Sequence, residues 1–215
     1  MLAAGCGSEE EQSAARATSV RAIATPSPDL ATRVVGGDEL VGFHLVADDE
    51  NEVLTDPERF SVDHARLHAH PAEAATALRR DGFVAGTVKR FQPRQRGGLA
   101  ESIAVQMRDA NGAAAEAKRQ FGAAFAPSPE EPRCAIRSER FEVPRVPGAV
   151  AVEIRHKVDG DVFDNTTIVF TQGAFVYQVF ASGAGIHDER DELIDATQAL
   201  HGRWRWNASV SPRYP

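Results

Sequence analysis

The sequence is poor in cysteine and has no long apolar run. Two cysteines, Cys6 and Cys134, occur in 215 residues, which excludes a disulfide-rich scaffold. No segment approaches the roughly 18 consecutive apolar residues of a transmembrane helix. With 24 basic and 31 acidic residues, the chain has a net charge of −7. This balance excludes the basic surface on which nucleic-acid binding depends.

Local signatures of catalysis are also missing. The chain has no glycine-rich phosphate loop, Gly-x-Ser-x-Gly turn, paired-cysteine zinc pattern or His-Glu-x-x-His helix. We therefore expect a protein that is not an enzyme, with no catalytic residues and no cofactor. What remains is ordinary globular material, 42% hydrophobic and 26% charged.

The first residues carry a motif that predicts lipid attachment. The run Met1-Leu2-Ala3-Ala4-Gly5-Cys6 resembles the lipobox of bacterial lipoproteins, in which a leucine, small residues and a glycine precede the lipidated cysteine. The resemblance implies that residues 1–6 are the remnant of a lipoprotein signal and that Cys6 carries the diacylglycerol. A full signal peptide has basic and apolar regions before the cleavage site. Either the coding sequence continues upstream of Met1, or the motif is accidental in a cytosolic chain.

Residues 7–29 are expected to form a disordered tether. The segment has no aromatic residue and closes with Thr25-Pro26-Ser27-Pro28, so it buries too little apolar surface to offset the entropy of ordering. The lipid is then the only attachment, and the protein is expected on the extracytoplasmic face of the cell membrane. Cys134 is left without a partner for a disulfide bond.

Residues 30–215 are expected to form a single α+β domain. Residues 30–60 are predicted to be irregular, with one short strand at the domain edge. Apolar spacing and end signals predict helices over 71–80 and 109–126, and a last helix that begins near Asp188. Alternating apolar residues and turn signals predict six strands, over 83–91, 99–107, 136–143, 150–158, 166–171 and 174–181. Hairpin-joined strands with helices between them predict a mostly antiparallel sheet covered by helices.

Three segments resemble small envelope lipoproteins of actinobacteria. They are Arg80-Asp81-Gly82-Phe83-Val84-Ala85-Gly86, the proline-containing run Phe141 to Ala149, and Phe170-Thr171-Gln172-Gly173-Ala174-Phe175-Val176-Tyr177. Proteins of this kind often carry a PsbP-like domain behind the lipobox. The resemblance covers roughly residues 60–205 and implies an α/β/α sandwich. It carries over no catalytic residue.

The densest cluster of polar side chains is Asp63-His64-x-x-x-His68-x-His70. If residues 61–70 were helical, His64 and His68 would share one face and could bind a metal ion. Pro71 disfavours a helical conformation at His70, so a solvated loop is the alternative interpretation.

Three functions stay open at this point. The first is an envelope lipoprotein, expected to be a monomer, that binds a partner protein or a small apolar or lipid ligand. The second is an envelope hydrolase that uses scattered residues such as Glu153, His156 and Asp164. The third is a metal-handling lipoprotein that uses His64, His68 and His70. We expect the first, because the sequence contains no catalytic constellation.

Overall fold

A single antiparallel sheet dominates the fold. The computed structural model describes residues 24–46, 52–64, 70–93, 98–125, 134–158, 161–183 and 190–209. Within these ranges seven strands follow the order β1-β2-β3-β7-β6-β5-β4. The strands are β1 (Phe43–Leu45), β2 (Phe83–Pro93), β3 (Gly98–Met107), β4 (Cys134–Phe141), β5 (Val150–Val158), β6 (Asp161–Gln172) and β7 (Phe175–Gly183). The six predicted strands are therefore confirmed, and β1 is the short edge strand expected between residues 30 and 60.

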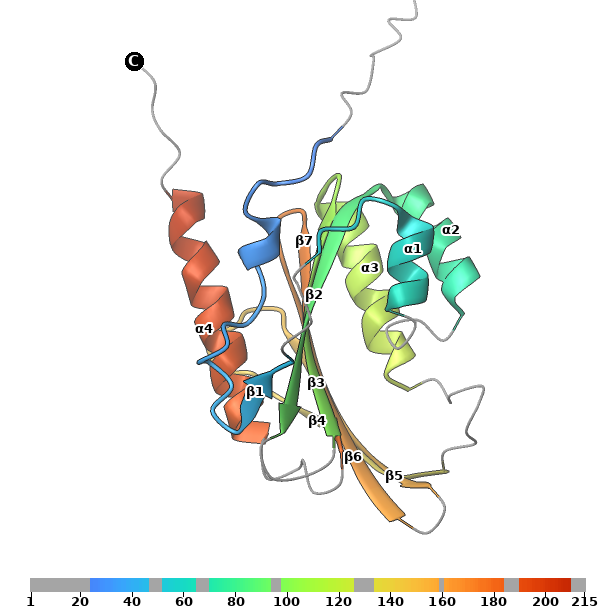
Figure 1. The fold of residues 1–215 in the computed structure, drawn as a ribbon, viewed down its shortest axis with the longest axis vertical. Coiled ribbons are helices and arrows are strands. Elements are labelled where there is room, and N and C mark those ends of the chain that lie inside the picture. The colour runs from blue at the N-terminus through green and yellow to red at the C-terminus, as the bar shows by residue number, and fades with distance from the viewer. Residues whose placement is uncertain are drawn as a thin grey trace, which may run out of the picture.

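The helices lie on both sides of this sheet, with α4 on one side and the other three on the opposite side (Figure 1). The described elements are η1 (Leu30–Thr32), α1 (Pro57–Asp63), α2 (Pro71–Asp81), α3 (Ala110–Ala123) and α4 (Arg190–Ser209). The three predicted helices correspond to α2, α3 and α4. Among the described residues, none of these helices has the length and apolar character needed to cross a membrane.

Local signals explain where the helices begin and end. The Asp56 side chain accepts hydrogen bonds from the backbone N–H groups of Glu58 and Arg59 at 2.7 and 3.1 Å, which starts α1. The Asp109 side chain accepts one from the N–H of Gly112 at 2.9 Å, which starts α3. The sequence-based interpretation of residues 57–60 as irregular is wrong, because the Asp-Pro start signal does produce a short helix.

The prediction of a PsbP-like α/β/α sandwich with a sheet covered by helices is wrong. On one side, α1, α2 and α3 pack mainly against β2, β3, β7 and β6, and β5 and β6 extend past them (Figure 1). On the other side, α4 shares the sheet with an irregular segment. Helices do not cover the sheet on this side, because the N-terminal segment fills much of the face beside α4.

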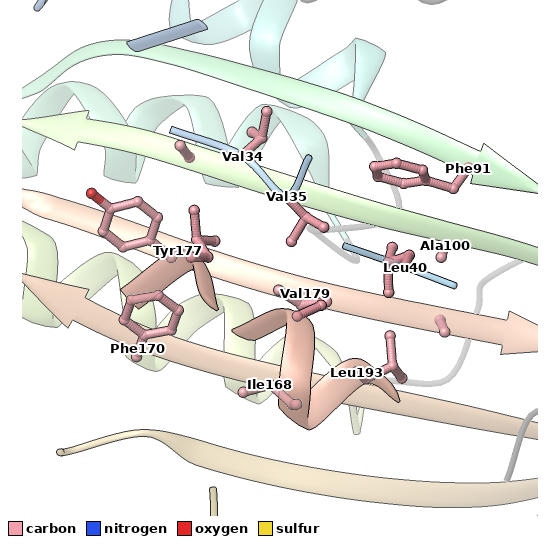
Figure 2. Close-up of a cluster of buried hydrophobic side chains, with 14 of the residues drawn as sticks. Val34, Val35, Leu40, Phe91, Ala100, Ile168, Phe170, Tyr177, Val179 and Leu193 are labelled. Carbon is pink, nitrogen blue, oxygen red and sulfur yellow. The ribbon is translucent and has the colours of Figure 1, made fainter. Parts of the chain in front are cut away.

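Figure 2 shows how the N-terminal segment enters the core. Val34, Val35 and Leu40 lie on the same face of the sheet as Leu193 of α4, in one buried cluster with Phe170 and Tyr177. The cluster also contains Leu30 and Phe43, and each of these five side chains is at most 2% exposed. Burial of such side chains stabilises a protein by roughly 1.5–3 kcal/mol each. The folded domain therefore depends on the burial of residues 30–43.

Candidate functional site

A polar group with several hydrogen bonds and ring contacts lies where the N-terminal segment meets the sheet. The guanidinium of Arg33 lies between the rings of Phe175 and Trp204, 4.0 and 4.1 Å from their centres. Its Nη1 donates a hydrogen bond to the Tyr177 hydroxyl at 2.8 Å, and Nε and Nη2 each donate to the Asp29 carboxylate at 3.0 Å. We call this group, together with Ser27, the junction cluster.

Electrostatics hold the junction cluster in its ionised form. Burial alone would lower the pKa of Arg33, but its hydrogen bonds to Asp29 and Tyr177 hold that pKa above the usual value. Burial alone would raise the pKa of Asp29, and the hydrogen bonds from Arg33 and Ser27 hold it below the usual value instead. Every charge here is met by a partner, so the cluster is suited to fixing the chain in place and not to acid–base chemistry.

The junction cluster extends toward the N-terminus through backbone contacts. The N–H of Ser27 donates to Oε1 of Gln106 in β3 at 2.7 Å, and Nε2 of Gln106 donates to the carbonyl of Thr25 at 3.2 Å. Contacts with the sheet thus begin at Thr25, inside the segment that the sequence assigns to the tether. Cys6 and the rest of residues 1–23 lie outside the described residues.

The proposed metal ligands are placed in different settings. His64 follows the last residue of α1, and its Nδ1 lies 3.1 Å from Nη2 of Arg90. Because arginine can only donate, Nδ1 accepts, and its lone pair is directed at the guanidinium. His70 is exposed at the start of α2, and His68 lies outside the described residues. In the part of the chain that the structure describes, no three His, Cys, Asp or Glu side chains group around a common point.

The environment of His64 leads to a prediction about pH. Burial, and then the positive charge of Arg90, lower the pKa of His64 from 6.5 to about 4. The neutral ring thus contributes stability that is complete above about pH 6.5 and is lost as the pH falls toward 4. Two-dimensional NMR titration is expected to show the His64 ring resonances moving near pH 4. A His64→Asn variant is expected to lose this part of the acid sensitivity in urea unfolding, and a ring titrating near pH 6.5 would contradict the contact.

The residues of the hydrolase alternative do not converge. Glu153 and His156 belong to β5, and Asp164 belongs to β6. Side chains three positions apart on a strand point to opposite faces, which separates His156 from Glu153. Asp164 faces Arg155 across the strands and accepts hydrogen bonds from it at 2.7 and 3.3 Å. The sheet thus divides His156 from the two carboxylates.

A buried charged group that the sequence did not indicate links α2 to α3. Glu116 is fully buried on α3 and accepts hydrogen bonds from Nε and Nη2 of Arg119 at 3.0 and 2.7 Å. Gln120 donates to the second oxygen of Glu116 at 3.0 Å, and Arg119 also contacts Asp81 at the end of α2. Burial raises the pKa of Glu116 despite the opposing charge of Arg119. The helical spacing places Glu116 inward, but its charge argues for the outside, so only the structure reveals the group.

Comparison with known proteins shows a likeness in fold. No family model and no curated protein matches the chain. Among solved structures, the chain is similar to the extracellular domain of PknH from Mycobacterium tuberculosis, with 11% identity and a TM-score of 0.50 over 84% of this chain and 99% of that one. At this identity the likeness shows the fold alone. The chain therefore shares the fold of that domain, in place of the expected PsbP-like one.

Proposed function

We propose that the chain is an envelope lipoprotein of an actinobacterium, attached to the extracytoplasmic face of the cell membrane through lipidated Cys6. The lipobox of residues 2–6 carries the proposal. The likeness of the fold to an extracellular domain supports the location. Lipoprotein diacylglycerol supplies two acyl chains, which satisfies the requirement for stable anchoring that one chain does not meet.

The junction cluster fixes the point at which such a tether joins the folded domain. The described chain enters the domain at the end of the sheet where α4 also finishes (Figure 1). Arg33 fixes this entry to β7 through Tyr177. In the anchored protein, the opposite end of the sheet, where β2, β3, β5 and β6 form hairpins, is the end farther from the point of attachment. The tether is therefore not expected to cover that end.

Within the envelope, the domain acts by binding a partner protein or a small apolar ligand, and not by catalysis. Two observations support this choice over the alternatives. The lone pair of His64 Nδ1 is directed at Arg90, which competes with a metal ion. His156 is separated by the sheet from Glu153 and Asp164, which leaves the proposed hydrolytic residues apart.

The anchor is tested by replacing each cysteine in turn. The gene is expressed in an actinobacterial host with the genomic sequence that precedes Met1, and the membrane and soluble fractions are compared. The wild-type chain and Cys134→Ser are expected in the membrane fraction, with a mass that includes diacylglycerol on Cys6. Cys6→Ser is expected to lose both properties. A wild-type chain with an unmodified Cys6 in the soluble fraction would overturn the proposal.

A further inference from the structure

The strand β4 forms one edge of the sheet. It follows β5 at the end of the strand order, and no strand in the described ranges pairs with its outer side. Arg137, Ser138 and Arg140 are exposed there. An edge of this kind offers a row of backbone N–H and C=O groups to another strand. The other edge strand, β1, has three residues against eight in β4, so β4 is the edge long enough for pairing.

The charges along β4 have an order that matches a second copy of the same strand. Arg137, which is positive, and Glu139, which is negative, flank Ser138. Both lie on the α4 side of the sheet, where Nη1 of Arg190 in α4 lies 3.5 Å from Oε1 of Glu139. When two copies pair antiparallel about a two-fold axis through Ser138, Arg137 of each faces Glu139 of the other. Opposite charges that face each other across strands are stabilising.

The neighbouring pairing registers lack this match. Backbone groups point alternately to the two sides of a strand, so a two-fold antiparallel pair can be centred on one residue or the next. An axis through Arg137 places two arginines opposite each other, and an axis through Glu139 does the same with two glutamates. Only the axis through Ser138 opposes unlike charges twice, and it uses nearly all of the strand, residues 135–141 of Cys134–Phe141.

Arg140 does not interfere with this arrangement. Its guanidinium lies 5.4 and 6.0 Å from the ring centres of Phe121 and Phe125, which keeps it on the α3 side of the sheet. In one copy, Nη2 of Arg137 already contacts Oε2 of Glu139 at 2.5 Å. The two side chains are therefore held side by side at the edge and can exchange partners across the axis.

We propose that two copies of the chain pair through β4, antiparallel about Ser138, and form one sheet that is continuous across the dimer. The proposal replaces the expectation of a monomer and does not depend on the lipid anchor. The two copies recognise each other through backbone hydrogen bonds, and the Arg137–Glu139 pairs select the register. Because these pairs are exposed, association weakens as the salt concentration rises.

Charge reversal tests the proposal on the full 215-residue chain. Sedimentation velocity under reducing conditions, which exclude disulfide-linked dimers, is run from about 1 µM to about 0.2 mM protein. Wild type is expected to dimerise in this range. Arg137→Glu and Glu139→Arg each place like charges opposite each other, and each is expected to weaken dimerisation about tenfold or more. The exposed Lys118→Glu on α3 makes the same charge change as Arg137→Glu away from β4 and is expected to dimerise like wild type.

Mixing the variants provides the decisive measurement. Arg137→Glu has an acidic edge and Glu139→Arg has a basic edge, so an equal mixture is expected to form heterodimers with wild-type affinity. The double variant, with both reversals in one chain, is expected to regain homodimers. A wild-type chain that stays monomeric throughout the range would overturn the proposal. So would a mixture that associates no more strongly than the single variants.

Discussion

Gly112→Ala is expected to destabilise the protein by about 2–3 kcal/mol, although the same change inside a helix normally stabilises it. A Cβ atom at Gly112 would lie 2.3 Å from the backbone carbonyl oxygen of Asp81 and 3.4 Å from Cβ of Met107. The first distance is far below van der Waals contact, and the opposing atom is backbone and cannot rotate away. The end of α2 and the first turn of α3 must separate, which also disturbs the bond from Gly112 to the Asp109 cap.

The same helix supplies the matched control. Gly122 is exposed near the end of α3, and a Cβ there would meet nothing within 4 Å. Gly122→Ala is therefore expected to stabilise the protein by about 0.5 kcal/mol, because alanine loses less backbone entropy in a helix. Urea unfolding followed by circular dichroism measures both variants. If Gly112→Ala unfolded at the same urea concentration as Gly122→Ala, the close approach of α2 to α3 would be refuted.

The strands are the elements that the sequence predicts best, for a physical reason. In β5, apolar side chains recur at every second residue from Val150 to Ile154, and period two has no other common structural source. The register of the neighbouring hairpin, in which Val158 pairs with Asp161, follows from the Asp159-Gly160 turn signal. Strand identity is thus encoded locally, by residues that are close together in the chain.

Residues 30–43 could not be placed in the same way. Their apolar side chains follow neither a helical nor a strand period, and their burial depends on β7 and on Leu193 of α4, more than 130 positions away in the sequence. The expected irregular backbone and the short edge strand β1 (Phe43–Leu45) were correct, but the sequence did not predict that Val34, Val35 and Leu40 lie in the core. Because this segment occupies one face of the sheet, the sandwich architecture was also wrong.

The candidate sites, too, depend on contacts between residues far apart in the sequence, which the sequence does not reveal. The spacing of His64, His68 and His70 suggested metal ligands, but the partner of His64 is Arg90, which lies 26 positions away on β2. Nothing near His64 in the sequence identifies that contact. The cap at Asp109 and the proline at position 71 were predictable, because capping is a local interaction.

Arg119→Leu is expected to cost about 3–5 kcal/mol at neutral pH, which is the range for breaking a buried ion pair by removing one partner. Arg119 supplies two hydrogen bonds to the fully buried Glu116 and also contacts Asp81. Without it, the carboxylate of Glu116 loses both hydrogen bonds from Arg119 and still accepts the one from Gln120. Urea unfolding at pH 7 measures the loss. Arg80→Leu, which removes an exposed partner of the same Asp81, is expected to cost less than about 1 kcal/mol.

The pH dependence of the stability loss shows whether Arg119→Leu acts through the buried charge of Glu116 or through lost packing. Burial raises the pKa of Glu116 above its ordinary 4.5, so the folded state keeps this proton at pH values where the unfolded state has released it. The stability associated with the protonated form is complete below about pH 4.5 and is lost as the pH rises through the raised folded-state pKa. The cost of Arg119→Leu is therefore expected to be small near pH 4 and to grow toward pH 7.

A second substitution isolates the charge itself. Glu116→Gln, added to Arg119→Leu, keeps an acceptor for the Gln120 hydrogen bond and removes the ionisable group. The double variant is expected to recover most of the lost stability at pH 7 and to lose most of the extra pH dependence. A double variant as unstable as Arg119→Leu at every pH would mean that the packing of the arginine stem, and not the burial of the Glu116 carboxylate, holds α2 against α3. Recovery would instead identify Arg119 as the residue that stabilises the buried Glu116 carboxylate where α3 meets α2, since the lost stability would then follow the charge and not the volume.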